Sequence, residues 1–182
     1  MKSFTLDSNC IIDLEENRPA TAHLEEIKRF WHSGVIELAV VSVSASENQP
    51  TGQASRDYAE FEAKLERAGL TGARELYPIG IWDLGYWNHM LWSGEELERQ
   101  VYGIKDILFP SIQHEPPTEP AANSKWRNQM CDVLVAWAHG FHKTDYLITR
   151  DKNFHKKAQN LVQYGIRNIV TPEEALKLAK CT

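Results

Sequence analysis

Four carboxylates stand at places in the chain where a fold can bring them together: Asp7, Glu47, Asp132 and Asp151. Asp7 ends the apolar run FTL in the stretch FTLDSNCIIDL, and Asp151 follows YLIT at a similar distance. Glu47 lies just past the apolar run IELAVVSV, and Asp132 interrupts the apolar stretch CDVLVAWA. If the four side chains converge, their mutual repulsion destabilises the fold unless a cation lies among them.

Magnesium or manganese is the cation that suits such a set of ligands, because hard cations prefer carboxylate oxygen and water. One or two of these ions can activate a water and stabilise the leaving oxygen when a phosphodiester is cleaved. Cys10, Cys131 and His155 lie near the acids in the sequence. Oxygen, however, is the ligand atom that recurs at the segment ends, which argues against zinc. The sequence therefore predicts a Mg²⁺ or Mn²⁺ site.

The acids also have simpler interpretations. Asp7, Ser8 or Asn9 could be the N-cap of a helix that begins there, because each side chain can accept a hydrogen bond from the first amides of the helix. Asp132 could be a partly exposed acid at the edge of an apolar helix stripe. The local sequence leaves these alternatives open.

The expected elements alternate between strands and helices, which is typical of an α/β protein with a parallel sheet. The expected strands are residues 2–6, 36–43, 76–82, 146–149 and 167–170. The expected helices are residues 9–16, 19–33, 55–70, 93–101, 124–142 and 154–164, and a last helix capped by Thr171-Pro172-Glu173-Glu174. Because the carboxyl ends of parallel strands share one edge, we expect the strands holding Leu6 and Thr149 to be neighbours.

Length and composition predict a single globular domain over residues 1–182, since 42% of the residues are hydrophobic. The net charge of −5 argues against broad, salt-driven binding to nucleic acid but leaves room for a local basic patch. We expect no membrane span and a cytoplasmic location, because the chain lacks a run of eighteen apolar residues and a signal-peptide pattern. Residues 110–123 are expected to be a mobile loop near the acidic site, because four prolines and little apolar content give the segment nothing to pack against.

Other residue types could bind nucleic acid or metal. Arg150, Lys152 and Lys156 flank Asp151 and could contact phosphates, or could be a solvated helix start. The tryptophan-rich residues 82–92 could stack on bases, although packing in a core or against a partner is the alternative that we favour. The histidines at positions 139 and 142 lack a third zinc ligand at a diagnostic spacing, and the thiol at position 131 has the apolar surroundings of an inert cysteine.

Taken in order, the stretches LDSNCIIDL, ENQ, CDVLVAWA and LITRDKNF resemble the motifs of PIN-domain proteins over nearly the whole chain. The resemblance implies a three-layer α/β/α fold with a central parallel sheet and metal-dependent cleavage of single-stranded RNA. It also implies a role as the toxin beside an antitoxin protein, and a homodimer. By position, the four acids would be the catalytic and metal-binding residues, and Asn9 and Thr149 would be polar supports of the site. The segment before Asp132 is longer than in compact members, so residues 82–123 are expected to be an insertion.

Two other functions stay open. A PIN-like module that has lost cleavage could serve as a binding or scaffold protein. Phosphatases that form an aspartyl-phosphate also place an Asp after the first strand, but they follow it two positions later with an acid, and here that residue is Asn9. Hydrolysis of a small phosphomonoester would distinguish this class.

Overall fold

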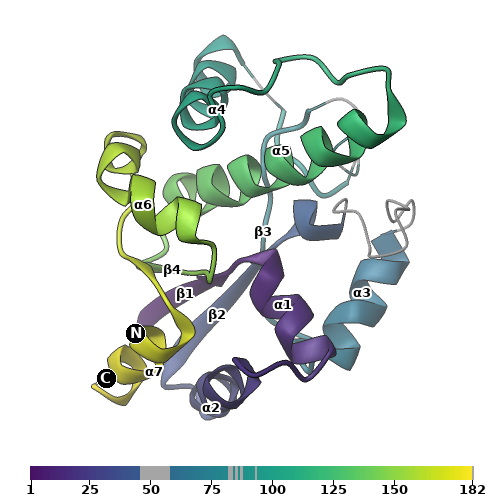
Figure 1. The fold of residues 1–182 in the computed structure, drawn as a ribbon. Helices are drawn as coiled ribbons and strands as arrows, with labels where there is room; N and C mark the ends of the chain where they lie inside the picture. Colours follow the sequence, from purple (N-terminus) through teal and green to yellow (C-terminus); the bar gives the residue numbers. More distant parts are fainter. Residues whose placement is uncertain (46–57, 82–83, 85, 87, 93, 182) are drawn as a thin grey trace.

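The computed structural model describes residues 1–45, 58–81, 84, 86, 88–92 and 94–181 (Figure 1). Its five-stranded sheet has the order β3-β2-β1-β4-β5, and every pair of neighbouring strands is parallel. The strands are β1 (Lys2–Leu6), β2 (Ile36–Val41), β3 (Arg74–Leu76), β4 (Tyr146–Ile148) and β5 (Ile169–Val170). The predicted parallel α/β sheet is therefore confirmed.

Helices cover both faces of this sheet (Figure 1). The helices are α1 (Ser8–Glu15), α2 (Thr21–His32), α3 (Tyr58–Arg67), α4 (Glu95–Leu108), α5 (Pro120–Phe141), α6 (Lys152–Leu161) and α7 (Pro172–Lys180), with short 3₁₀ turns η1 (Ser42–Ala45) and η2 (Val162–Tyr164). Side chains of α1, α2, α3 and α7 form one apolar cluster, and those of α4, α5 and α6 form another. This is the expected three-layer α/β/α arrangement. None of the helices in the described residues is long and apolar enough to cross a membrane.

Strand β2 shows why the apolar runs in this sequence do not alternate with polar residues. Leu38 and Val40 belong to the cluster under α1, α2, α3 and α7, whereas Ala39 and Val41 belong to the cluster under α4, α5 and α6. Successive side chains of a strand point to opposite faces, and here both faces are covered. An unbroken apolar run is the pattern that such a buried strand requires.

Helix α5 begins four residues earlier than predicted, so the expectation of a loop through residue 123 is wrong at its end. Pro120 occupies the first turn of the helix, where its missing N–H costs no hydrogen bond. The Glu119 carboxylate accepts hydrogen bonds from the backbone N–H of Ala121 at 3.1 Å and of Ala122 at 2.6 Å. Because a glutamate is an unusual N-cap, the local sequence did not mark this start.

The rest of the proline-rich segment has more contacts than the sequence suggested. Ile112 packs against the core cluster of α4, α5 and α6. Its carbonyl accepts a hydrogen bond from the buried Nζ of Lys105 at 3.0 Å, and the Gln113 carbonyl accepts one from Trp126 Nε1 at 3.0 Å. The expectation that the segment has nothing to pack against is therefore wrong, whereas its mobility stays a prediction.

The cap predicts a measurable loss of stability. Replacing Glu119 with Ala removes both side-chain acceptors from the first turn of α5, and is expected to lower the free energy of unfolding by about 1 kcal/mol. Urea denaturation of the purified variant measures this loss. Glu115→Ala, an exposed glutamate of the same segment, is the matched control and should leave the unfolding midpoint unchanged. Equal midpoints for Glu119→Ala and the control would show that the cap contributes nothing.

The third strand is shorter than predicted and begins earlier. The sequence suggested residues 76–82, but β3 is Arg74–Leu76, and Trp82 lies outside the described residues. Proline at position 78 has no N–H to donate to a strand ladder, which explains the early stop. Past this proline, an isolated bridge joins Ile79 and Leu91.

Helix α4 is longer than predicted, because it continues past Val101 to Leu108. Gly103 lies inside it, where glycine usually weakens a helix. A Cβ at this position would lie only 2.0 Å from the hydroxyl oxygen of Tyr164. The glycine therefore allows the close approach of α4 to the turn after α6. Tyr164 is distant from Gly103 in the sequence, so the helical position of this glycine alone does not suggest that it makes room for a side chain.

Candidate functional site

Asp7 lies at the carboxyl end of β1 and is the N-cap of α1, so the N-cap alternative is confirmed for this residue. One carboxylate oxygen accepts a hydrogen bond from the Ser8 N–H at 2.7 Å. The other accepts hydrogen bonds from the Thr149 hydroxyl at 2.6 Å and from the Asn9 side-chain amide. With only 1% of its surface exposed, Asp7 is a buried carboxylate held by several donors.

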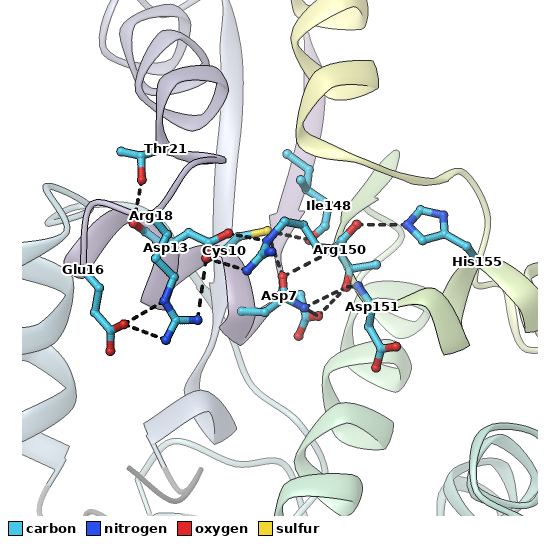
Figure 2. A network of polar contacts seen from close by, with 12 residues as sticks. Asp7, Cys10, Asp13, Glu16, Arg18, Thr21, Ile148, Arg150, Asp151 and His155 are labelled. Atoms are coloured by element: carbon cyan, nitrogen blue, oxygen red, sulfur yellow. Dashed lines mark hydrogen bonds and ion pairs between the residues drawn. The ribbon is translucent and has the colours of Figure 1, made fainter. Parts of the chain in front are cut away.

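Thr149 connects Asp7 to the second acid of the site. Its hydroxyl, which donates to Asp7, accepts a hydrogen bond from the backbone N–H of Asp151 at 3.0 Å and another from the Asn9 amide at 3.0 Å. Asp151 is the N-cap of α6, and its carboxylate accepts a hydrogen bond from the Asn153 N–H at 2.7 Å. Figure 2 shows Asp7 and Asp151 in one network of polar contacts, with the Asp151 carboxylate pointing away from Asp7.

The sheet topology explains this proximity. Strands β1 and β4 are parallel neighbours, with Leu6 opposite Ile148, as the sequence predicted for the strands before Asp7 and Asp151. The Asp7 N–H also donates to the Ile148 carbonyl at 3.0 Å, which extends the ladder by one bond beyond β1. Two acids that are 144 positions apart in the numbering therefore share one edge because parallel strands end together.

The other two predicted acids have different outcomes. Asp132 lies on α5 between the buried Cys131 and Val133, and is itself partly exposed. Glu47 lies outside the described residues. Among the residues that are described, no group of three or more His, Cys, Asp or Glu side chains is arranged to hold a metal ion. The structure thus brings Asp7 and Asp151 together but does not add Asp132 to them as a third ligand, and the four-acid metal site stays a prediction.

The donor chemistry at this edge fits a hard cation better than zinc. The Asp7 carboxylate and the Thr149 hydroxyl lie here, and the Asn9 amide and the Asp151 backbone N–H donate hydrogen bonds to them. Mg²⁺ is commonly held by one or two carboxylates together with water and substrate phosphate, so a complete protein cage is not required. A cation here would share the Asp7 carboxylate with its present hydrogen-bond donors.

The basic residues beside Asp151 are not equivalent. Lys152 and Lys156 are exposed on α6, whereas the guanidinium of Arg150 is paired with the carboxylate of Asp13. His155 hydrogen-bonds through Nε2 to the Thr149 carbonyl at 3.0 Å, which ties the first turn of α6 to the end of β4.

Asp13 is the residue of this region that the sequence analysis missed. It is fully buried on α1, and its carboxylate lies 2.6 Å from Arg150 Nη2 and 2.5 Å from Arg150 Nε (Figure 2). The signal that could have found it is the one used for Asp132, an acid inside an apolar helical stretch, here CIIDL. A fully buried carboxylate requires a charged or hydrogen-bonding partner.

The cysteines and histidines have structural surroundings. Burial, followed by the nearby carboxylates of Asp7 and Asp13, raises the pKa of the Cys10 thiol well above its usual value. Cys131 is also buried, in agreement with an inert thiol. His139 hydrogen-bonds to Thr144 and to the Arg167 carbonyl, and His142 to the Tyr77 carbonyl, so each already has a protein partner.

The aromatic residues of the 82–92 stretch differ in their surroundings. Tyr86 packs against the core cluster of α1, α2, α3 and α7, whereas Trp92 is 85% exposed. Trp82 and Trp87 lie outside the described residues. Packing is therefore the role of Tyr86, and stacking on bases stays a prediction for the exposed Trp92.

Comparison of the chain with protein-family models, with curated proteins and with solved structures finds no match.

Proposed function

We propose that this protein is a cytoplasmic, Mg²⁺- or Mn²⁺-dependent endoribonuclease that cleaves single-stranded RNA at the acidic edge of its sheet. The observation that supports this most is the meeting of Asp7 and Asp151 at the ends of two neighbouring parallel strands, joined through the Thr149 hydroxyl. The resemblance of four sequence stretches to PIN-domain motifs agrees with this geometry. It also suggests a toxin that pairs with an antitoxin protein, and a homodimer.

The residues of the chain would divide the work. Asp7 and Asp151, with Asp132 and Glu47 completing the set, would hold the ion, and a bound ion would supply the activation of a water and the stabilisation of the leaving oxygen. Thr149 and Asn9 fix the orientation of the Asp7 carboxylate through their hydrogen bonds. Lys152 and Lys156 lie on the helix that begins at Asp151, where their charges can attract the phosphates of RNA.

Metal removal tests the proposal directly. A labelled pool of single-stranded RNA is incubated with the protein in EDTA, and then after addition of an excess of Mn²⁺. We expect no cleavage in EDTA and recovery with Mn²⁺, because the acids supply charge but cannot by themselves generate a hydroxide at neutral pH. Anomalous density for Mn²⁺ beside Asp7 and Asp151 in a soaked crystal would locate the ion. Cleavage that persists in EDTA would contradict the proposal.

One feature of the site favours a second candidate, a PIN-like binding or scaffold module without cleavage. Asp7 is nearly inaccessible and already accepts three hydrogen bonds, so its carboxylate has a complete structural role without an ion. Under this alternative, crystals soaked in millimolar Mn²⁺ would show no anomalous peak at the acidic edge. The phosphatase alternative is less well supported, because the Asn9 amide donates to Asp7 and cannot serve as a proton-donating acid.

A further inference from the structure

The pair formed by Asp13 and Arg150 is the most deeply buried charged contact beside the acidic edge. The Asp13 side chain has no exposed surface, whereas the Arg150 side chain is 42% exposed. Two nitrogens of the guanidinium, Nη2 and Nε, face the two carboxylate oxygens at 2.6 and 2.5 Å. Nη2 donates a hydrogen bond to Oδ1, whereas the contact of Nε with Oδ2 is an ion pair that leaves the buried Oδ2 without a hydrogen bond.

The ion pair with Asp13 occupies only part of the guanidinium. An arginine has five N–H donors and no acceptor, so one hydrogen bond to Asp13 leaves further donors on the exposed side of the group. A second arginine, Arg18, lies 4.0 Å from the same carboxylate, which is too far for a hydrogen bond. Arg150 is therefore the main partner of Asp13, and Asp13 fixes the plane in which the remaining N–H groups of Arg150 point.

The position of Arg150 in the chain connects this pair to the site. Arg150 stands between Thr149 and Asp151, and its backbone N–H donates to the Asn9 side-chain oxygen at 3.2 Å. Figure 2 shows its side chain extending from the turn after β4 toward Asp13, with Asp7 and Cys10 nearby. The guanidinium therefore lies close to Asp7, on the residue that precedes Asp151.

We infer that Asp13 is a positioning residue that orients Arg150, and that the oriented guanidinium contacts a phosphate of RNA beside the acidic edge. This inference rests on the proposed function for its ligand. It assigns Asp13 a role through Arg150 and no contact with RNA of its own. Lysine is expected to replace the arginine poorly at this position, because an ammonium group lacks the planar set of donors that can contact a carboxylate and a phosphate together.

A double-mutant cycle with Asp13→Asn and Arg150→Lys tests the inference. Both variants are expected to fold, because Asn is close in volume to Asp and Lys keeps a positive charge opposite Asp13. Binding of a fluorescent single-stranded RNA is measured by anisotropy in EDTA, so that cleavage is not required. Arg150→Lys is expected to weaken binding about fivefold and Asp13→Asn about threefold. The double variant should bind like Arg150→Lys alone, because Asp13 acts through the guanidinium.

A matched control shows whether the loss of RNA affinity is specific to Arg150 or follows the loss of any exposed arginine. Arg74 is 45% exposed and is paired with Glu37, but it lies on the outer strand β3, two strands away from β1. Arg74→Lys should bind RNA like the unsubstituted protein. Thermal melts of all variants show whether a change in affinity follows a change in stability.

The possible outcomes distinguish the inference about Asp13 and Arg150 from the proposed nuclease function. If Asp13→Asn weakens binding equally in the unsubstituted protein and in the Arg150→Lys variant, Asp13 does not act through the guanidinium and the inference is wrong. If Arg150→Lys binds RNA normally while the protein still cleaves RNA in Mn²⁺, the inference fails and the proposed function stands. Binding that follows the expected cycle without cleavage supports the inference and overturns the nuclease. Absence of RNA binding in EDTA together with absence of RNA cleavage in Mn²⁺, both for the unsubstituted protein, overturns both.

Discussion

Replacing Asp151 with Asn is expected to reduce cleavage of single-stranded RNA by about 100-fold or more, while the protein stays folded. Asparagine is as good an N-cap as aspartate, so its side-chain oxygen can still accept the hydrogen bond from the Asn153 N–H. The substitution removes a negative charge at nearly constant volume. A loss of activity would therefore report on the charge of Asp151 and its hold on a cation, because α6 keeps its cap.

Asp132→Asn tests the third acid in the same way. We expect cleavage to fall by orders of magnitude here too, as when a group that positions the attacking water is lost. The stability of the metal-free protein should hold or rise, because repulsion among the remaining acids is relieved. This variant is informative because Asp132 does not form a three-ligand group with Asp7 and Asp151 among the described residues.

The matched control is Asp145→Asn. Asp145 precedes β4 as Asp151 follows it, and its carboxylate accepts hydrogen bonds from the N–H and the hydroxyl of Ser3, each at 2.8 Å. Asparagine can accept both bonds, and this residue lies at the opposite end of the strand from the site. Single-turnover cleavage of a labelled RNA in Mn²⁺, with circular dichroism to check the fold, compares the three variants. Full activity in either Asp151→Asn or Asp132→Asn would exclude that residue from the mechanism.

The second large effect is expected from His139, whose burial makes the fold sensitive to acid. The side chain has no exposed surface, and this burial lowers its pKa from 6.5 to about 4, although the Arg167 carbonyl and Asp145 act in the opposite direction. Because a carbonyl can only accept, Nε2 carries the proton that is donated to Arg167, at 3.0 Å. Nδ1 then accepts from the Thr144 hydroxyl at 2.6 Å. The folded protein therefore holds a neutral imidazole.

The direction of the pH effect follows from the two pKa values. In the unfolded chain the imidazole binds a proton below pH 6.5, whereas in the folded protein it does so only near pH 4. The contribution of His139 to stability is present above pH 6.5 and is lost as the pH falls from 6.5 to 4. Between pH 7 and pH 5 this group alone is expected to lower the free energy of unfolding by about 2 kcal/mol.

Urea denaturation at a series of pH values, with the unsubstituted protein and His139→Gln, measures this contribution. The glutamine variant is less stable at pH 7 because it loses the packing and the hydrogen bonds of the imidazole, but its stability should depend less on pH. His32→Gln changes an exposed histidine at the end of α2 and should keep the full pH dependence. Parallel pH profiles for the protein and His139→Gln would contradict the assignment.

The sequence by itself determined the features that depend on neighbouring residues. The alternation of apolar runs and helical stripes predicted the α/β fold and the strands that precede Asp7 and Asp151, as observed for β1 and β4. The capping box predicted at Thr171 and Glu174 is present, with both reciprocal hydrogen bonds. Such signals can be read from the chain because strand ends, caps and turns are made by residues within a few positions of one another.

Tertiary structure alone decided which distant side chains meet. The ion pair of Asp13 and Arg150 joins residues 137 positions apart, and no local pattern marks one as the partner of the other. Gly103 continues a helix where its type suggests weakness, because Tyr164 approaches it across the fold. The strand order placed Asp151 beside Asp7 but did not bring Asp132 into a three-ligand group with them. Backbone hydrogen bonding and burial determine the helices and strands locally. The packing of these elements against one another determines which functional groups meet, because packing depends on the volume and charge of every side chain between the elements.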